Sequence, residues 1–357
     1  MEATLLIAAG GTGGHLFPGI AVADEVRRRD PAVRVVFVGT PRGLESRLVP
    51  RAGYPLEMLP ILPLNNVGLA RMLKGLLALP RAMWQAWALL RRLRPRTVLG
   101  IGGYAGGPVV LMAAVMGVRT VILEPNATPG FTNRLLRPFV KAAACAYEPA
   151  LAHYPGKGVL TGNPVRGGFA PAPAARGASA AKTLLVFGGS QGSRVLNRAM
   201  VAALPALPGP DLLRIVHQTG EAMRAEVDAA YEQAGRAGEV HAFLDDMPAR
   251  FAAADLIVCR SGATTCAELT ASGKASILVP FAQAADDHQK VNAETLAAAG
   301  AARMIEEKVL GGGSLAEAIT KTITDPDALA SMERAALRLA RPDAAARVAD
   351  LLELARV

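Results

Sequence analysis

The sequence predicts an α/β protein made of two doubly wound, Rossmann-like domains that face one cleft. Patterns typical of strands and helices alternate along all 357 residues, as in parallel sheets covered by helices on both faces. The strands are nearly continuous apolar runs, for example VRVVFVG at residues 33–39, which is expected when both faces of a sheet are buried. The length is too great for one typical core and fits two domains.

The predicted strands divide into two sets. In the first half they lie near residues 4–9, 33–38, 97–101, 119–123, 140–146 and 157–161, and in the second near 183–188, 212–217, 239–243, 255–259, 275–279 and 302–305. Segment 167–182 is rich in Gly, Ala and Pro and is typical of an interdomain linker. We therefore expect an N-terminal domain over residues 1–163 and a C-terminal domain over 164–342. A last helical stretch, about 343–357, is a candidate to pack back on the first domain.

A glycine-rich loop occurs twice. Residues 4–14 read TLLIAAGGTGG and residues 183–193 read TLLVFGGSQGS, so each loop follows an apolar strand and precedes a helical pattern. Such a loop places backbone N–H groups at a helix N-terminus, where they bind phosphate well. The structural alternative for each loop is a tight turn. The candidate ligand contacts are Thr12, Gly13, Gly14 and His15 in the first loop and Ser190, Gln191 and Gly192 in the second.

Two common nucleotide-binding motifs are missing. The first loop does not read GxGxxG, because Leu16 stands where the third glycine would fall. The second strand ends in Val38-Gly39-Thr40, without the acidic residue that would hold an NAD ribose. The Walker A pattern is also absent. A nicotinamide enzyme is therefore disfavoured, and we expect no cofactor.

A third candidate loop covers residues 260–268, which read RSGATTCAE and follow the apolar run ADLIVC. We expect Ser261 to cap the helix that begins here and the next N–H groups to face an anion. Glu268 lies about one turn into this helix and is suited to accept two hydrogen bonds from a ribose diol. The alternative for Glu268 is a solvated carboxylate on a helix surface.

Polar residues also follow other predicted strands. Residues 282–292 contain Asp286, Asp287, His288, Gln289 and Asn292. In the first domain the strand ends carry GGY at 102–104, with Tyr104, EPN at 124–126 and GNPVR at 162–166. Because the carboxyl ends of parallel strands meet at one edge of a sheet, we expect these groups to lie at that edge.

Neither the acidic residues nor the cysteines predict a metal site. Asp325 and Asp327 form a DxD pattern that follows no strand, and we interpret it as helix capping. Cys145, Cys259 and Cys266 are odd in number and lack CxxC spacing, which indicates a reducing compartment. Each cysteine is expected to be a small buried residue.

The net charge of +9 is concentrated in one stretch. Residues 58–123 contain no Asp or Glu but eight basic residues. Within it, residues 67–96 mix Leu, Met, Trp84 and Trp87 with cations, a composition that suits an anionic lipid surface. Ordinary amphipathic helices packed on the sheet are the alternative. Nucleic acid is disfavoured as a partner, because aromatic residues make up only 4% and no DNA- or RNA-binding motif occurs. No uncharged apolar run approaches the ~20 residues that span a bilayer.

Seven ordered sequence blocks together resemble the MurG family of peptidoglycan N-acetylglucosaminyltransferases. They are GGTGGHLFPGIAVA (10–23), GIGGYAGGP (100–108), EPNATPGFTN (124–133), GNPVR (162–166), GGSQGSRVLN (188–197), FLDDMP (243–248) and RSGATTCAEL (260–269). The resemblance implies a glycosyltransferase-B fold and inverting, metal-independent transfer of GlcNAc from UDP-GlcNAc to the 4-hydroxyl of the MurNAc-pentapeptide of lipid I. The products are lipid II and UDP. It also implies a peripheral location at the cytoplasmic face of the bacterial inner membrane.

The resemblance also assigns individual residues. Thr12, Gly13 and Gly14 match the family's donor-sugar loop, and Asn126, Arg166 and Ser190 match other donor contacts. Contacts to uracil, phosphate and ribose match Leu244, Ala263, Thr264, Thr265, Cys266, Ala267 and Glu268, beside Ser261 and Gly262. Gln289 and His288 match two glutamines that hold GlcNAc. His15 is a candidate for the general base or for fixing the acceptor, since an unperturbed histidine pKa of about 6.5 allows proton uptake at neutral pH.

Two positions depart from the family pattern. Pro125 and His288 stand where the family usually has glutamines. A UDP-GlcNAc 2-epimerase of the same fold is the main alternative, because it would share the donor site without a lipid acceptor. A basic nucleic-acid-binding protein is a second and weaker one.

Overall fold

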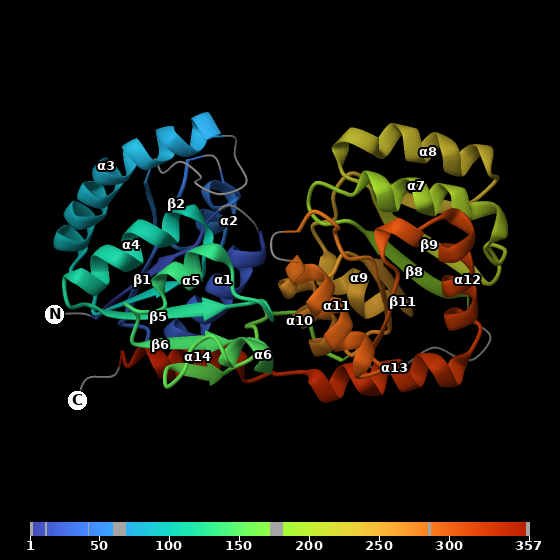
Figure 1. The fold of residues 1–357 in the computed structure, drawn as a ribbon. Coiled ribbons are helices and arrows are strands. Elements are labelled where there is room, and N and C mark those ends of the chain that lie inside the picture. Colours follow the sequence, from blue (N-terminus) through green and yellow to red (C-terminus); the bar gives the residue numbers. More distant parts are fainter. Residues whose placement is uncertain are drawn as a thin grey trace. The chain divides into compact units, whose positions relative to one another are not determined.

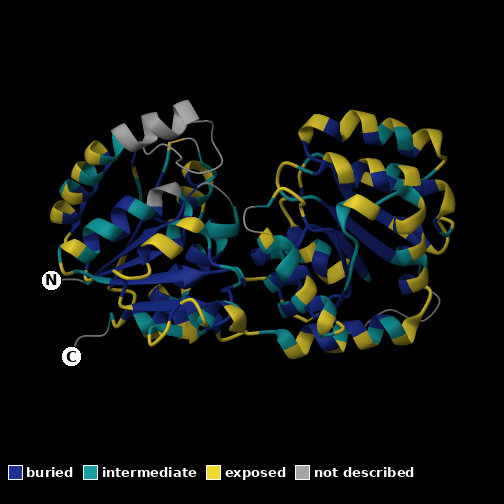
Figure 2. Cartoon of the chain, viewed as in Figure 1, coloured by how far each residue is buried: buried dark blue, intermediate teal, exposed yellow. Residues whose placement is uncertain are grey.

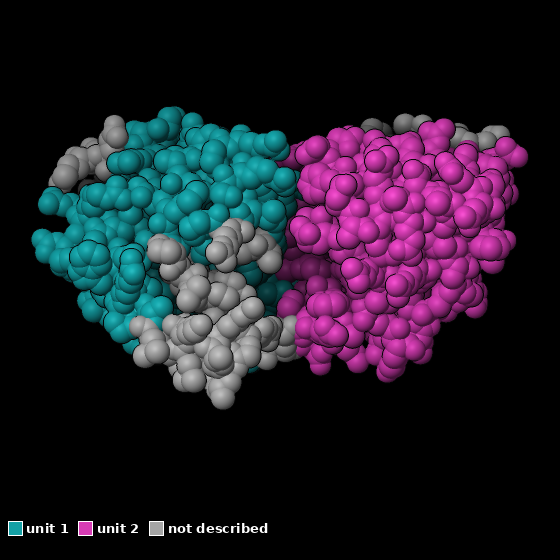
Figure 3. Space-filling model, turned by 90° about the horizontal axis from the view of Figure 1, so that it is seen from above, with its two compact units in different colours: residues 1–166, 341–357 teal, residues 167–340 magenta. Residues whose placement is uncertain are grey.

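The computed structural model describes residues 3–10, 13–41, 43–59, 69–171, 181–284 and 287–354, with the backbone alone for 69–77 and 104–105. The chain forms two compact units (Figure 3). Unit 1 comprises Met1–Arg166 and Arg341–Val357, and unit 2 comprises Gly167–Ala340.

Unit 1 is built on a parallel sheet in the order β3-β2-β1-β4-β5-β6-β7. Its strands are β1 (Thr4–Ala8), β2 (Arg34–Gly39), β3 (Leu56–Met58), β4 (Thr97–Gly100), β5 (Arg119–Glu124), β6 (Ala142–Cys145) and β7 (Gly158–Leu160). Strand order reverses at β1, which pairs with both β2 and β4. The carboxyl ends of β1 and β4 therefore form the switch point, where doubly wound sheets bind ligands.

Helices cover both faces of this sheet (Figure 1). One core contains side chains from α1 (Gly13–Arg29), α2 (Glu45–Arg51) and the C-terminal α14 (Ala344–Leu352). The other contains side chains from α3 (Leu69–Leu93), α4 (Gly103–Val115), α5 (Phe131–Leu136) and α6 (Glu148–Leu151). The inner strands β1, β2, β4, β5 and β6 are almost entirely buried (Figure 2), which explains their continuous apolar sequences.

Unit 2 repeats this design with the strand order β10-β9-β8-β11-β12-β13, again all parallel. The strands are β8 (Lys182–Phe187), β9 (Leu213–Gln218), β10 (Gly238–His241), β11 (Leu256–Cys259), β12 (Ser276–Leu278) and β13 (Ala302–Met304). The switch point lies between β8 and β11. The second glycine-rich loop follows β8, so both copies of the loop stand at a switch point.

The helices of unit 2 also lie on both faces of its sheet (Figure 1). One large core joins the sheet to α7 (Arg194–Ala203), α8 (Arg224–Gln233), α12 (Gly312–Ile323) and α13 (Pro326–Leu339). The remaining helices are α9 (Met247–Ala253), α10 (Ala263–Ala271) and α11 (His288–Ala298), and short 3-10 turns cover Leu204–Ala206, Glu221–Met223 and Glu307–Val309. Phe251 of α9 packs edge-on against Phe169 at 5.0 Å between ring centroids.

The predicted fold class is confirmed. Every strand expected from the sequence is present, and β3 is the one described strand that was not predicted. The three cysteines are free and buried, as expected. Residues 172–180, within the predicted linker, lie outside the described residues.

Candidate active site

The loop after β8 forms the first part of the candidate site in unit 2. Ser190 and Gln191 are exposed, and the Gly192 N–H donates to the Gly189 carbonyl at 2.9 Å. Gly192 has a φ of +71°, and a Cβ there would lie 1.8 Å from the carbonyl oxygen of Thr219. Only glycine can be accommodated here, because the loop packs directly against the backbone of Thr219 at the end of β9. Ser190 and Gln191, at the tip of the loop, are exposed and therefore accessible to a ligand.

Gln218, the last residue of β9, ties two of these loops together. Its side chain is 2% exposed. The Nε2 amide donates to the Gly189 carbonyl at 3.0 Å, and the Oε1 oxygen accepts from the Leu244 N–H at 2.8 Å. One amide thus links the loop after β8 to the loop after β10, a connection that needs both a donor and an acceptor.

The N-terminus of α10 is built differently from the prediction. Gly262 is the N-cap, with no side-chain capping bond, so the expected capping by Ser261 is wrong. Ser261 is fully buried, and its hydroxyl donates to the Gln289 carbonyl at 2.7 Å. Asn292 also reaches this turn, donating to the Ser261 carbonyl at 3.2 Å. Because the capping position lacks a side chain, the first N–H groups of α10 remain suited to an anion.

Glu268 lies inside α10 and is only 5% exposed. It is therefore not the solvated surface carboxylate that the sequence left as an alternative. Its neighbours Ala263, Thr264 and Cys266 are also buried, whereas Gly262, Thr265 and Ala267 are half-buried.

His288 and Gln289 begin α11, and both are half-buried. The Gln289 Oε1 oxygen accepts from the Phe281 N–H at 3.1 Å. This bond orients the amide so that its NH₂ group points away from the Phe281 backbone and is suited to donate. Asp286, between these loops, lies outside the described residues.

In unit 1, the loops after β1 and β4 pack together at the switch point. Gly103 has a φ of +74°, and a Cβ there would lie 2.3 Å from the Gly10 carbonyl oxygen. A Cβ on Gly102 would lie 3.3 Å from Nε2 of His15. Gly13 and Gly14 form the first turn of α1 next to His15. Thr12 and the Tyr104 side chain lie outside the described residues.

Glu124 ends β5 and is a buried carboxylate that accepts four hydrogen bonds. Its Oε1 accepts from the N–H and the side-chain amide of Asn126, at 3.0 and 3.3 Å. Its Oε2 accepts from the Gly130 N–H at 3.1 Å and from Asn133 Nδ2 at 2.8 Å. Burial raises the pKa of Glu124 from 4.5 to about 7, although these bonds act in the opposite direction. The network fixes the loop that carries Asn126.

Arg166 ends the first segment of unit 1. Its guanidinium stacks over the Phe17 ring, with Cζ at 4.0 Å from the ring centroid. Phe17 follows His15 closely on α1, so the stacking holds this cation on the first turns of α1 and restricts its orientation.

The predicted basic–apolar stretch corresponds to α3. Its described inner residues Ala86, Leu89 and Leu90 belong to the core, so part of the helix packs on the sheet. On the outside, Trp84 is 64% exposed and Trp87 is 38% exposed, and Arg91 stacks over Trp87. We call this surface, with exposed Arg81, the α3 patch. No helix within the described residues is both long and apolar enough to cross a membrane.

The described residues contain no cluster of three or more His, Cys, Asp or Glu that would hold a metal ion. Asp325 of the DxD pattern is the N-cap of α13, and its carboxylate accepts from the Ala328 N–H at 2.9 Å. The interpretation of this pattern as helix capping is confirmed.

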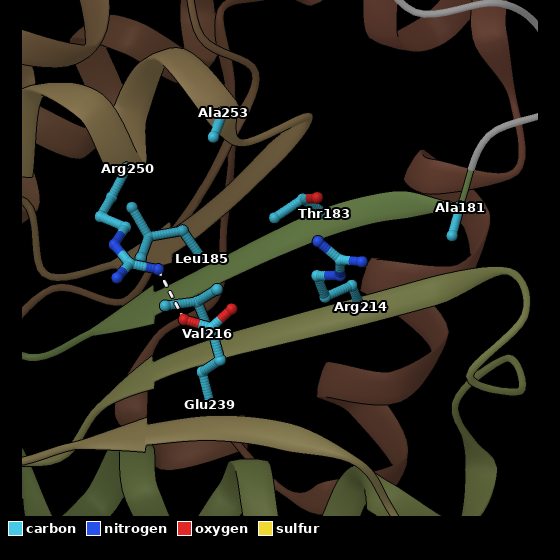
Figure 4. Close-up of a pocket in the computed structure, with 8 residues that line it drawn as sticks. All are labelled: Ala181, Thr183, Leu185, Arg214, Val216, Glu239, Arg250 and Ala253. Carbon is cyan, nitrogen blue, oxygen red and sulfur yellow. Dashed lines mark hydrogen bonds and ion pairs between the residues drawn. The ribbon is translucent and has the colours of Figure 1, made fainter.

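A pocket of about 380 Å³ opens on the sheet of unit 2, away from these loops (Figure 4). It is lined by Ala181, Thr183, Leu185, Arg214, Val216, Glu239, Arg250 and Ala253, and an Arg250–Glu239 ion pair of 2.6 Å crosses it. Ala181 and Thr183 lie at the start of β8, the opposite end from the glycine-rich loop. None of the predicted site residues lines this pocket, and it is not the candidate active site.

Three residues organise the loops: Gln218, Glu124 and Arg260. Sequence reasoning missed Gln218, and it assigned no such role to Glu124 and Arg260, although both stand in segments that it singled out. They share one signal, because each is a polar residue at the end of a buried apolar strand. Such a residue sits at the carboxyl edge of a parallel sheet, where it reaches the neighbouring loops.

Two parallel doubly wound sheets, each with a glycine-rich sequence after the strand at its switch point, define a two-domain protein of the glycosyltransferase-B class. Comparison with known proteins agrees. Residues 5–145 match the glycosyltransferase family 28 N-terminal domain, and residues 183–348 match the C-terminal domain of the same family. The chain belongs to the MurG family of glycosyltransferases.

The relatives extend over nearly the full chain. A protein of Anaeromyxobacter dehalogenans (strain 2CP-C) is 49% identical, with 99% of this chain and 93% of that protein covered. It is named UDP-N-acetylglucosamine–N-acetylmuramyl-(pentapeptide) pyrophosphoryl-undecaprenol N-acetylglucosamine transferase. A Myxococcus xanthus (strain DK1622) protein of the same name is 48% identical over 97% of this chain and 91% of its own length.

Solved structures show the same fold. The crystal structure of Acinetobacter baumannii MurG has a TM-score of 0.79 at 31% identity and covers 99% of both chains. The structure of UDP-GlcNAc 2-epimerase from Neisseria meningitidis, bound to UDP-GlcNAc, has a TM-score of 0.69 at 12% identity, covering 98% of this chain and 99% of that one. At that identity, the second likeness concerns the fold alone.

Proposed function

We propose that this protein transfers GlcNAc from UDP-GlcNAc to the 4-hydroxyl of the MurNAc-pentapeptide of lipid I, giving lipid II and UDP in peptidoglycan synthesis. The observation that carries this proposal is the 49% identity, over 99% of the chain, to a relative named for this transfer. The epimerase alternative has only the fold in its favour.

In this proposal unit 2 binds the nucleotide. Ser190, Gln191 and Gly192 and the N-terminus of α10 bind the diphosphate through backbone N–H groups and the serine hydroxyl. Glu268 accepts hydrogen bonds from the ribose diol, and its low exposure strengthens such bonds. Leu244 lies at the uracil, and the amide of Gln289, with His288 beside it, donates to hydroxyls of GlcNAc.

Unit 1 receives the acceptor and completes the contacts to the sugar. Thr12, Gly13 and Gly14, together with Asn126 and Arg166, contact the donor. Tyr104 lies near the acceptor, since it stands in the first turn of α4, shortly after the end of β4. The close packing of Gly102 against His15 supports a shared acceptor surface made by the loops after β1 and β4.

The reaction is a single in-line displacement. The acceptor oxygen O4 attacks C1 of GlcNAc as its proton passes to a general base, for which His15 is our candidate, and the bond from C1 to the diphosphate oxygen breaks. UDP leaves with the electron pair, and the configuration at C1 inverts. Helix N-termini and backbone N–H groups stabilise the charge that develops on the diphosphate, so the proposal needs no metal ion.

The α3 patch would hold the protein at the cytoplasmic face of the inner membrane. Exposed tryptophans beside arginines suit the headgroup region of an anionic bilayer. Peripheral binding of this kind brings unit 1 to an acceptor that is anchored in lipid.

The test is UDP release from UDP-GlcNAc with and without a lipid I analogue in detergent. We expect release that depends on the analogue and yields a disaccharide product. UDP release without acceptor, with N-acetylmannosamine as product, would instead support the epimerase. If folded protein neither turns over nor binds UDP-GlcNAc, the proposal is wrong.

A further inference from the structure

Arg260 is a buried cation at the centre of the strand ends in unit 2. It directly follows β11, and only 9% of the residue is exposed. Its Nη2 donates to the Ser193 hydroxyl at 2.7 Å, and its Nη1 donates to the carbonyls of Val279 and Pro280, both at 3.1 Å. Its Nη2 also lies 2.5 Å from a carboxylate oxygen of Glu307. The guanidinium therefore reaches the loops after β8, β12 and β13.

The hydrogen bonds of Arg260 to Ser193 and Pro280 connect it to two parts of the proposed donor site. Ser193 closes the glycine-rich loop and caps α7, where its hydroxyl accepts from the Leu196 N–H at 3.3 Å. A guanidinium on this hydroxyl fixes the end of the loop that would bind the diphosphate. The planar fork of arginine serves this purpose, because it donates in several fixed directions at once.

The hydrogen bond to the Pro280 carbonyl connects Arg260 to Gln289, the residue proposed to bind GlcNAc. The peptide group between Pro280 and Phe281 is held from both sides. Its oxygen accepts from Arg260, and its N–H donates to Oε1 of Gln289. Fixing this peptide plane fixes the orientation of the Gln289 amide. Arg260 also lies over the Phe281 ring, with Cζ at 5.4 Å from the centroid.

Glu307 offsets the free-energy cost of burying the Arg260 guanidinium. A buried charge is costly without a partner, and the carboxylate of Glu307, itself largely buried, supplies one. Apolar side chains in place of a buried ion pair often give a protein of equal stability. We therefore interpret the Arg260–Glu307 pair as positioning the loops.

We propose that Arg260 is a positioning residue that sets the spacing between the diphosphate loop and the GlcNAc-binding amide of Gln289. It touches no substrate and acts through Ser193 and through the Pro280–Phe281 peptide. This inference rests on the proposed function of unit 2 as the UDP-GlcNAc site. It extends that function by naming the residue that connects the part of the site for the diphosphate with the part for GlcNAc.

The test compares R260K with the wild type on three ligands: UMP, UDP and UDP-GlcNAc, titrated by calorimetry. Lysine keeps the charge but not the fork, so it cannot hold Ser193 and Pro280 together. We expect affinity for UDP-GlcNAc to fall about tenfold, as for the loss of one charge-assisted hydrogen bond, and affinity for UMP to change less than about twofold. R250K, at an arginine on α9 outside the site, is the matched control and should leave all three affinities unchanged.

Equal weakening of all three ligands by R260K would show a merely structural residue and overturn the proposal, as would unchanged binding of UDP-GlcNAc. If R260K does not fold, E307Q replaces it, because it loosens Arg260 without removing it. E307Q should weaken binding of UDP-GlcNAc more than binding of UMP, as R260K does, but by a smaller factor. Equal effects of E307Q on the three affinities would overturn the proposal. If the wild type itself binds no UDP-GlcNAc, the proposed function fails instead.

Discussion

Gln218 and Glu124 each end a buried strand. Gln218 holds the loops that follow the two neighbouring strands, whereas Glu124 holds the loop that follows its own strand. Gln218 links Gly189 to Leu244 in unit 2, and Glu124 gathers four N–H donors in unit 1. A buried polar group costs free energy unless it is bonded, so these residues are stable only when their loops are in place. The same bonds that satisfy the side chains therefore order the candidate site.

Glu124 should make stability depend on pH. Below pH 4.5 the carboxyl is protonated in both the folded and the unfolded chain. Between pH 4.5 and about 7 the folded chain keeps a proton that the unfolded chain has lost, so stability falls as pH rises through this window. We expect the free energy of unfolding of the wild type, minus that of E124Q, to fall by up to about 3 kcal/mol between pH 4.5 and 8. Urea unfolding of both proteins at several pH values measures this difference in free energy. A difference that does not change with pH would contradict the raised pKa of Glu124.

Glu268 gives a prediction about the donor. Replacing it by glutamine keeps its size but removes the charge that would strengthen the two proposed hydrogen bonds to the ribose. We expect E268Q to raise KM for UDP-GlcNAc by about 10- to 100-fold, with a smaller effect on kcat. E232Q, at an exposed glutamate on α8, is the control and should behave as the wild type. If E268Q has a normal KM, the ribose assignment is wrong.

How much of the site the sequence predicts depends on the kind of contact. The glycine loops, Glu268 and Gln289 stand in recognisable local patterns. The roles of Gln218 and Arg260 depend on which strands are neighbours, and their partners lie tens of residues away along the chain. Ser261 shows the same limit, because its hydroxyl bonds to Gln289 of α11 in preference to capping its own helix. Local reasoning finds candidates, but the sheet order decides what they touch.

At the scale of elements, the glycine loops depend on close backbone contact. G192A would place a Cβ 1.8 Å from the Thr219 oxygen, whereas a Cβ on Gly189 meets nothing within 4 Å. Both glycines have a positive φ, so both variants carry that strain, and G189A is the matched control. We expect G192A to be less stable than G189A by about 1–3 kcal/mol, the cost of overpacking. Equal stability of the two variants in urea would argue against a tight contact between the loop and β9.

The α3 patch gives a prediction about membranes. We expect R81Q/R91Q to weaken binding to vesicles that contain phosphatidylglycerol by about 2 kcal/mol, or about 30-fold, because each arginine near an anionic surface contributes about 1 kcal/mol. W84A should weaken the part of the binding that persists at high salt. R198Q/R224Q, which removes two exposed charges from unit 2, is the control. Equal losses for the two double variants would mean that net charge alone, and not the patch, drives binding.

The elements themselves follow from the sequence with few exceptions. Long apolar runs such as those of β1, β2 and β8 are unambiguous, because burial on both faces leaves little choice of residue. Strand β3 has only three residues, Leu56–Met58, and lies at the edge of the sheet with little burial, so its sequence has no such pattern. Its existence depends on pairing with β2 through Phe37, Val38 and Gly39.

At the scale of the whole molecule, the chain returns to its starting unit. α14 packs in the core of unit 1, and the Thr97 hydroxyl donates to the Leu352 carbonyl at 2.8 Å. Arg119 adds hydrogen bonds to the Leu351 carbonyl and an ion pair of 2.6 Å with Glu353. Unit 2 is thus joined to unit 1 by two chain crossings, near residues 166 and 341. Each unit keeps its own sheet, its own core and its own loops, which fits a division between donor and acceptor.

The most direct test of the account is formation of the new glycosidic bond. Purified protein is incubated with UDP-GlcNAc labelled in the sugar, a lipid I analogue and EDTA, and the label is counted in the lipid product after separation. The account predicts labelled disaccharide lipid in amounts equal to the UDP released, and loss of this product when the analogue is omitted. Label that stays on the nucleotide or appears only as free sugar, in protein that binds UDP-GlcNAc, would contradict it.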